Sequence, residues 1–222
     1  MMGHQQAELE WRDAQVPVSI RFDDPYYSLE NGLAETRHVF LGGNDLPARL
    51  RDGFAVAELG FGTGLNTLAL ASVWTGAGRV RLTSFEAYPL AAEDMAHALA
   101  PFSEVAPMAV QLVNAWAEGA RSFALGALDV EIIEGDARET LPTWEYAADA
   151  WFLDGFSPAK NPELWSPELM LAVGAHTKPG GSAATYTAAG SVRRGLERAG
   201  FAVERVPGFG RKRHMTRARM IA

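Results

Sequence analysis

The segment that most constrains the fold is an apolar run followed by three closely spaced glycines. Residues 54–59 are almost all apolar, as in a strand buried within a parallel sheet, and Gly60, Gly62 and Gly64 follow at every second position. Residues 66–74 are mostly apolar and predict a helix. A strand, a glycine turn and a helix start together place backbone N–H groups around a ligand, which glycine allows to come close. The sequence therefore predicts a ligand-binding loop in an α/β fold.

Two acidic residues near the glycines narrow the choice of ligand. Nicotinamide, flavin and S-adenosylmethionine (AdoMet) folds share the glycine pattern. Glu58 places a carboxylate beside the loop, where it would repel a pyrophosphate and suit the cationic end of AdoMet. Glu86 follows Gly64 by 22 residues, close to the spacing at which an acid meets ribose hydroxyls in such folds. We expect AdoMet as the cofactor; the alternative is a strand-to-helix turn that binds no ligand.

The remainder of the chain alternates strand-like and helix-like segments, which indicates a parallel α/β sheet. Residues 101–127 are expected to be mostly helical and residues 46–50 to form a short helix. The pattern predicts a Rossmann-like fold of seven strands, with residues 1–50 as a small N-terminal extension or cap and residues 51–222 as the AdoMet-binding domain. After the first strand, the expected strands are residues 79–86, 128–133, 149–153 and 182–187, followed by an antiparallel pair at 201–206 and 214–221.

Acidic residues recur where the predicted strands end. Ligands of open α/β sheets bind at the carboxyl ends of the strands, and these ends carry Glu58, Glu86, Asp136 and Asp154. As AdoMet ligands, Glu86 would accept hydrogen bonds from the ribose, Asp136 would accept from the adenine amine, and Glu58 would offset charge near the methionine end. For any one of these acids alone, a helix cap or a loop position is the alternative.

Residues 154–162 are the predicted reaction centre. Two prolines and a Gly-Phe step fix this loop beside the expected position of the AdoMet methyl group. Asp154, Phe156, Lys160 and Asn161 could orient a nucleophile there.

Composition excludes several other classes of protein. The 222 residues include no cysteine, and no phosphate loop, serine nucleophile elbow or paired-histidine metal motif is present, so we expect no metal site. The chain starts with polar residues and has no apolar run long enough to span a bilayer, which predicts a cytoplasmic protein that does not bind membranes.

The charge is distributed unevenly along the chain. The net charge is −7, yet residues 193–222 carry nine Arg or Lys and two Glu. An acidic body with a basic C-terminal segment can still present a local footprint for nucleic-acid phosphates. The alternative is a solvated charged face.

Several longer motifs follow one another along the chain, at residues 22–28, 31–44, 60–66, 84–86, 149–162, 192–196 and 208–213. Together they resemble the methyltransferase half of the bifunctional tRNA wobble-uridine enzymes of the MnmC family and their single-domain relatives. The resemblance runs from about Phe22 to the C-terminus, and the blocks around Asp154 and Gly208 are absent from generic AdoMet enzymes.

The resemblance implies AdoMet-dependent N-methylation of 5-aminomethyl-(2-thio)uridine at the wobble position of tRNA. The flavin-dependent domain that follows in the bifunctional enzymes is expected to be absent from this chain. The expected catalytic residues are Asp154 and Phe156. The expected AdoMet ligands are Glu58, Gly60, Gly62, Gly64, Asn66, Glu86, Asp136 and Asp154; the expected contacts to the substrate or tRNA are Tyr26, Tyr27, Asn31, Lys160, Arg193, Arg194, Arg211, Lys212 and Arg213.

Two other functions remain open from the sequence. An aminopropyltransferase of the polyamine type shares the fold and uses decarboxylated AdoMet. A non-catalytic module that binds tRNA or AdoMet is the second alternative, although such a module would not need to retain the full set of strand-end acids.

Overall fold

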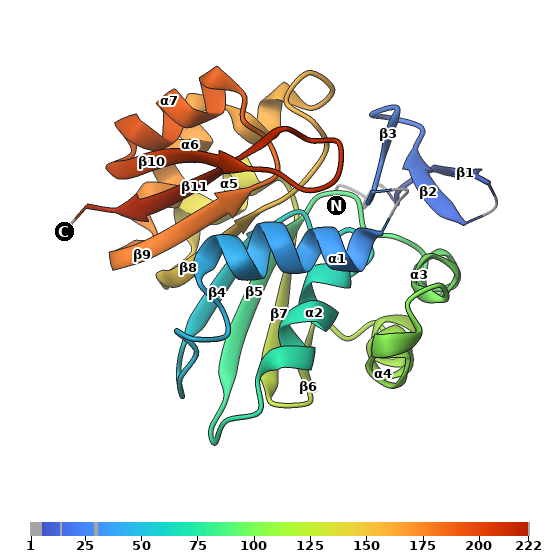
Figure 1. Cartoon of the computed structure of the whole chain (residues 1–222). Helices are drawn as coiled ribbons and strands as arrows, with labels where there is room; N and C mark the ends of the chain where they lie inside the picture. Colours follow the sequence, from blue (N-terminus) through green and yellow to red (C-terminus); the bar gives the residue numbers. More distant parts are fainter. Residues whose placement is uncertain (1–5, 14, 29–30, 222) are drawn as a thin grey trace.

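A computed structural model describes residues 6–13, 15–28 and 31–221 and is built around an eight-stranded sheet (Figure 1). Five strands are mutually parallel and form the centre of this sheet. The strand order is β10-β11-β9-β8-β4-β5-β7-β6, in which β6, β10 and β11 run antiparallel to their neighbours. The strands are β4 (Ala55–Leu59), β5 (Val80–Glu86), β6 (Ser122–Leu125), β7 (Leu128–Glu134), β8 (Ala148–Leu153), β9 (Thr177–Thr185), β10 (Phe201–Pro207) and β11 (His214–Met220).

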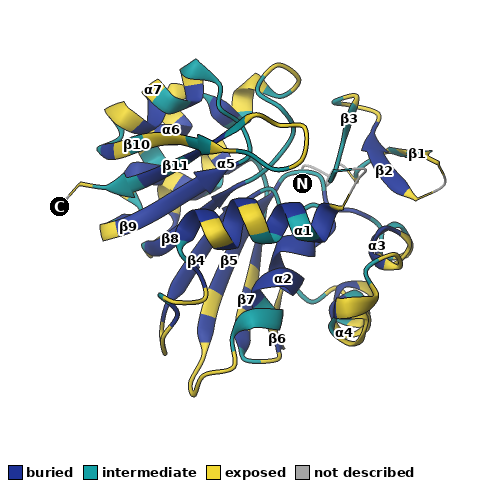
Figure 2. Cartoon of the chain, viewed as in Figure 1, coloured by how far each residue is buried: buried dark blue, intermediate teal, exposed yellow. Residues whose placement is uncertain are grey.

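Helices cover both faces of the sheet, because successive side chains of each strand point to opposite sides. In β8, Phe152 joins the core under one helical layer and Trp151 joins the core under the other. The first layer contains α1 (Gly32–Thr36), α2 (Leu65–Val73), α3 (Ala92–Leu99) and α4 (Ala106–Ala117), and the second contains α5 (Ala137–Thr140), α6 (Pro167–Ala175) and α7 (Gly190–Arg198). Figure 2 shows the central strands buried and the outer sides of the helices exposed.

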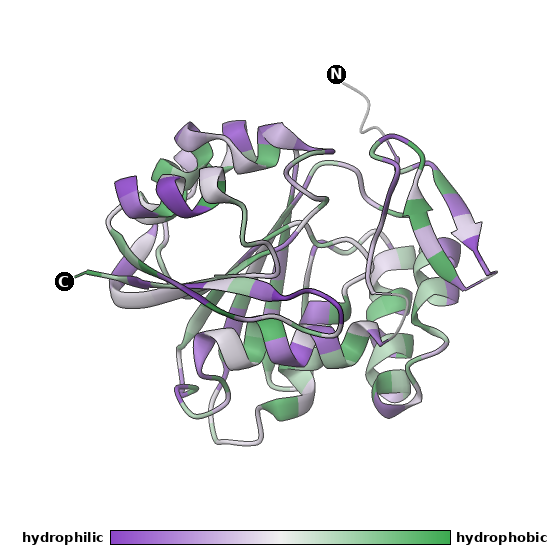
Figure 3. Ribbon diagram, turned by 45° about the horizontal axis from the view of Figure 1, so that its top comes forward, coloured by the Kyte–Doolittle hydropathy of each residue, from purple (hydrophilic) through white to green (hydrophobic). Residues whose placement is uncertain are grey.

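Helix surfaces carry both hydrophilic and hydrophobic residues, as expected for helices that lie on a sheet (Figure 3). Within the described ranges, no helix combines the length and the apolar character that crossing a lipid bilayer requires.

The predicted fold class is confirmed, with all seven predicted strands of the sheet present. The expectation of a mostly helical segment at 101–127 is partly wrong, because residues 122–125 pair with β7 as the edge strand β6. The short helix expected at residues 46–50 is also wrong, since these residues form turns.

The amino-terminal segment has two different surroundings. Strands β1 (Leu9–Arg12), β2 (Val16–Ser19) and β3 (Asp24–Pro25) form a separate three-stranded antiparallel sheet. Residues 33–50, by contrast, contribute Leu33, Phe40 and Leu50 to the main core. The boundary at residue 50 stays a prediction, and residues 33–50 of the extension pack as part of the main body.

Asn44 fixes residues 33–50 from within the core. Its fully buried amide Nδ2 donates to the carbonyl oxygens of Phe40 at 2.9 Å and Trp151 at 3.1 Å, and its Oδ1 accepts from the Ser182 hydroxyl at 2.6 Å. Every polar atom of this side chain therefore has a partner, which offsets the cost of burying it.

Candidate cofactor and acceptor site

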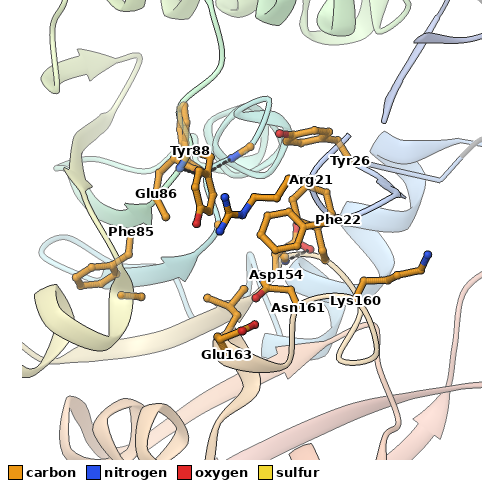
Figure 4. Close-up of a pocket in the computed structure, with 18 of the residues that line it drawn as sticks. Arg21, Phe22, Tyr26, Phe85, Glu86, Tyr88, Asp154, Lys160, Asn161 and Glu163 are labelled. Carbon is orange, nitrogen blue, oxygen red and sulfur yellow. Dashed lines mark hydrogen bonds between the residues drawn. The ribbon is translucent and has the colours of Figure 1, made fainter. Parts of the chain in front are cut away.

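A cavity of about 430 Å³ lies at the carboxyl ends of the parallel strands (Figure 4). Gly60 and Gly62 line it with positive φ angles of 82° and 54°, a conformation that glycine adopts without strain. A Cβ on Gly60 would lie 3.2 Å from the backbone oxygen of Asp154, so a side chain there would crowd the end of β8. The predicted glycine loop thus forms one wall of a ligand-sized cavity.

Glu86 ends β5 beside the glycine loop. Its Oε2 accepts from the backbone N–H of Gly62 at 2.9 Å, and its Oε1 accepts from the backbone N–H of Tyr88 at 2.7 Å. Burial raises the pKa of Glu86, and the backbone donors oppose this shift. The carboxylate is therefore held rigidly at the cavity wall with lone pairs left to accept further hydrogen bonds.

Asp136 has a local partner at the end of β7. It caps α5 by accepting from the backbone N–H of Arg138 at 2.8 Å, and its carboxylate also pairs with the guanidinium of that residue. Arg138 holds the pKa of Asp136 below its usual value. Both side chains line the cavity, so a ligand amine at this end would share Asp136 with Arg138.

Glu58 and Asp154 are joined by one amide. Asn66 Nδ2 donates to Glu58 Oε1 and to Asp154 Oδ2, each at 2.8 Å, while Asn66 Oδ1 accepts from the Thr36 hydroxyl at 2.9 Å. The Ser84 hydroxyl donates to Glu58 Oε2 at 2.6 Å. Glu58 has no exposed surface and is not among the residues that line the cavity, so it contacts the site through Asn66. Burial raises its pKa to about 8.

Asp154 borders two cavities. It lines the 430 Å³ cavity and also a second cavity of about 450 Å³, and Pro25, Tyr26 and Thr36 line both as well. Its Oδ1 accepts from the backbone N–H of Gly155 at 2.8 Å. Burial raises the pKa of Asp154 to about 6, which leaves the group ionised at neutral pH. A charged carboxylate thus stands at the junction of the two spaces.

The second cavity contains an ion pair that sequence analysis did not identify. Lys212 Nζ lies 2.7 Å from Glu35 Oε1 and 4.2 Å from the centre of the Tyr186 ring. All three residues line this cavity together with Phe209 and Arg211. Glu35 lies on α1, whereas Lys212 lies on the connection between β10 and β11.

Aromatic residues from the small sheet and from the Asp154 loop form the roof of the first cavity. Phe22 stacks on Phe156 with ring centres 4.7 Å apart, and Tyr26 meets the edge of Phe156 at 5.0 Å. Figure 4 shows Arg21 and Phe22 extending over the cavity, and the Arg21 guanidinium lies 4.7 Å from the Tyr88 ring centre. The predicted aromatic contacts at Tyr26 and Phe156 therefore come together, and Arg21 is a cavity cation that the sequence did not reveal.

Ion pairing holds this roof in place. Lys160 pairs with Asp23, and Asp24 Oδ2 accepts from the backbone N–H of Ser157 at 2.7 Å. Lys160 still lines the first cavity. Tyr27 lines both cavities, but its hydroxyl donates to backbone oxygens of Gln15 and Ala98, so its polar end is committed to the protein.

Several predicted contacts lie away from the cavities. Asn31 caps α1 by accepting from the backbone N–H of Ala34, and Gly64 caps α2 with φ 77°. Arg193 is half-buried and Arg194 exposed on α7, and neither lines a cavity. Arg213 is exposed on the same connection as Lys212. These positions give Asn31 and Gly64 structural roles, and the arginines remain predicted tRNA contacts.

The first cavity has the groups that AdoMet requires. Glu86 can accept hydrogen bonds from ribose hydroxyls, Arg21 or Lys160 can pair with the cofactor carboxylate, and the rings of Phe22 and Phe156 suit a sulfonium cation. Within the described ranges, no cluster of three acidic or histidine side chains could hold a metal ion.

Comparisons with known proteins identify the family of the chain. Residues 101–221 match the family described as S-adenosyl-L-methionine-dependent methyltransferase. The chain therefore belongs to this family of AdoMet-dependent methyltransferases.

Two relatives and one solved structure are similar over nearly the whole chain. The chain is 47% identical over 95% of its length to the tRNA 5-methylaminomethyl-2-thiouridine biosynthesis bifunctional protein MnmC of Caulobacter sp. strain K31, and 44% identical over 94% to that of Aeromonas hydrophila. It spans 38% and 34% of these two proteins. The crystal structure of MNMC2 from Aquifex aeolicus aligns with a TM-score of 0.74 and 26% identity, covering 98% of this chain and 71% of that one. The predicted resemblance to the MnmC family is confirmed.

Proposed function

We propose that this chain methylates the amine of 5-aminomethyl-(2-thio)uridine at the wobble position of tRNA. The observation that carries the proposal is Asp154, a carboxylate at the junction of an AdoMet-sized cavity and a second cavity of similar volume. The names of the MnmC relatives support a thiouridine product of this kind.

The acceptor amine sets the chemical problem. An alkylamine has a pKa near that of lysine, about 10, so most of it is protonated at neutral pH and lacks a lone pair. Bound AdoMet would supply a methyl group on a positively charged sulfur, with S-adenosylhomocysteine as the leaving group once the S–CH3 bond breaks. The acceptor nitrogen gains an N–C bond in exchange and must lose a proton. The protein has to select the neutral amine, or remove its proton, and to aim the nitrogen.

Asp154 meets these needs from its position between the cavities. Because it is ionised at neutral pH, it can accept a hydrogen bond from the amine and take up the proton that the nitrogen loses. Gly155 N–H and Asn66 each hold one of its oxygens, so the carboxylate does not have to reorganise. Phe156 and Tyr26 close the space around the amine and exclude water.

We further propose that exposed arginines outside the cavities dock the tRNA. Arg194 and Arg213 are exposed and could contact backbone phosphates. Such contacts would position the anticodon without reading its sequence.

Nucleoside mass analysis tests the proposal. The protein is incubated with AdoMet and tRNA that carries 5-aminomethyl-2-thiouridine, and the digested nucleosides are weighed. We expect a gain of one methyl group on the aminomethyl nitrogen. An aminopropyl gain with decarboxylated AdoMet would favour the polyamine-type alternative, and binding without any mass change would favour a non-catalytic module.

A further inference from the structure

The Glu35–Lys212 pair presents two complementary groups to the second cavity. Lys212 Nζ and Glu35 Oε1 are 2.7 Å apart, and the Lys212 ammonium also lies over the Tyr186 ring. Residues 177 positions apart in the sequence are thus brought together on the cavity that Asp154 also lines. A ligand in this cavity meets a hydrogen-bond donor and an acceptor side by side.

The burial of the Glu35 carboxylate distinguishes this pair from an ordinary surface ion pair. The Glu35 side chain is 11% exposed and the Lys212 side chain 45% exposed, so the carboxylate is nearly enclosed and depends on few partners. A nearly buried carboxylate that faces a cavity can accept strongly from a ligand N–H.

The edge of uracil fits such a pair. Uracil carries the N3–H donor next to the C4 carbonyl acceptor, and C4 is bonded to C5, which bears the aminomethyl group. Cytosine has the reverse arrangement, with an acceptor at N3 and an amino donor at C4. An aminomethyl group that reaches Asp154 therefore leaves the C4 carbonyl and N3–H within the same cavity, where Lys212 and Glu35 can meet them.

We propose that Glu35 and Lys212 select the base, with Glu35 accepting from N3–H and Lys212 donating to the C4 carbonyl of uracil. This inference rests on the proposed function, because it takes the acceptor to be a 5-aminomethyluridine. Sites built to bond a polar N–H reject analogues that lack it by large factors, since their buried polar groups stay unpaired.

The test compares two anticodon stem-loops that differ only in the substituent on N3 of the wobble base. One carries 5-aminomethyluridine and the other its N3-methyl derivative, which has no N3–H. Binding in the presence of S-adenosylhomocysteine and methyl transfer from AdoMet are both measured. We expect the wild-type protein to prefer the parent base by about 10²-fold or more in both measurements.

The variants separate recognition from folding. Glu35→Ala should lose most of this preference, whereas Glu35→Gln should keep part of it because an acceptor oxygen remains. Lys212→Met should weaken binding of the stem-loop with the parent base by about 10-fold. Arg205→Met is the matched control, since Arg205 is an exposed cation on β10 that lines neither cavity. Cofactor affinity should be unchanged in all of them, which a folding defect would not allow.

The outcomes distinguish the inference from the function on which it rests. If the wild-type protein methylates the parent base and both Glu35→Ala and Lys212→Met keep its full preference, the inference fails and the proposed function stands. If the wild-type protein modifies neither stem-loop, the proposed function fails and the inference falls with it.

Discussion

Glu58 and Asp154 lie near the ends of two neighbouring strands and both accept a hydrogen bond from the Asn66 amide. Their access to ligands nevertheless differs. Glu58 lies inside β4, so its side chain is fixed on the α2 face and closed off by Ser84 and Asn66. Asp154 follows the last residue of β8 and faces two cavities. A shift of two residues relative to the strand end thus separates a sealed carboxyl group from one that can meet ligands. A residue that follows the last residue of a strand is therefore a better candidate for ligand contact than a residue within the strand near its end.

The largest expected effect tests Asp154, the member of this comparison that lines the cavities. Asp154→Asn keeps the size of the side chain and one acceptor oxygen but removes the charge. General acid–base assistance contributes about 10²–10⁴-fold, so turnover should fall by that factor while AdoMet affinity changes little. Steady-state methylation assays and calorimetry measure the two quantities.

The pH dependence sharpens this result. Because the pKa of Asp154 is raised to about 6, wild-type turnover should fall as the pH drops through that value and protonates the carboxylate. Asp154→Asn should lose this acidic limb, and higher pH should partly rescue it by supplying more neutral amine. Turnover close to wild type at neutral pH would remove Asp154 from the mechanism.

Glu86 tests whether a strand-end acid that lines the cavity binds the cofactor. Glu86→Ala should weaken AdoMet binding by about 1–3 kcal/mol, because charge-assisted hydrogen bonds to the ribose are lost. Calorimetry with AdoMet measures this loss. Wild-type affinity in the variant, or binding of NADH in place of AdoMet, would contradict the assignment.

Glu58 should influence stability in a pH-dependent way. Its pKa in the folded protein is raised to about 8 by burial, so between the ordinary carboxyl pKa and pH 8 the unfolded chain ionises before the folded one. Wild-type stability is therefore lost as the pH rises through this window. Glu58→Gln, which cannot ionise, should gain more than about 1 kcal/mol relative to wild type between pH 5 and pH 8.

Denaturant unfolding at several pH values provides the measurement for Glu58. Asp129→Asn is a suitable control, because Asp129 is an exposed strand carboxylate paired with Arg79. A parallel pH dependence in wild type and Glu58→Gln would mean that Glu58 is charged in the folded protein.

The smallest effect is expected at the surface arginines. Arg213→Ala should lower the slope of log tRNA affinity against log salt by about one unit if Arg213 contacts a phosphate. Filter binding over a range of salt concentrations gives the slope, and AdoMet affinity serves as the internal control. An unchanged slope would assign Arg213 to a solvated face.

Local patterns predicted most of the fold and part of the site. The glycine loop and Glu86 were accessible to sequence analysis because strand, turn and helix follow one another without interruption between Ala55 and Val73. Strand β6 was missed because its four residues have no strong alternation and become a strand by pairing with β7. Edge strands of this length depend on tertiary contacts more than on their own sequence.

Contacts between residues far apart in the sequence account for the site features that the sequence did not predict. The sequence predicted Lys212 as a tRNA contact on the basis of its basic neighbours, whereas its ammonium pairs with Glu35 inside a cavity. The network of Thr36, Asn66 and Asp154 likewise joins three separate segments. No local pattern encodes such distances, because the pairing follows from the topology of the sheet.

The buried bonds of Asn44 have a consequence for the order in which the chain can fold during synthesis. Asn44 bonds to Trp151 and Ser182, and its neighbour Asp45 pairs with Arg217 and Arg219 near the C-terminal end of the sheet. Of the 222 residues, 181 precede Ser182, so Asn44 Oδ1 gains its Ser182 partner only after these have been made. Asn44 and Asp45 are translated early but complete their contacts late, because their partners lie on β8, β9 and β11.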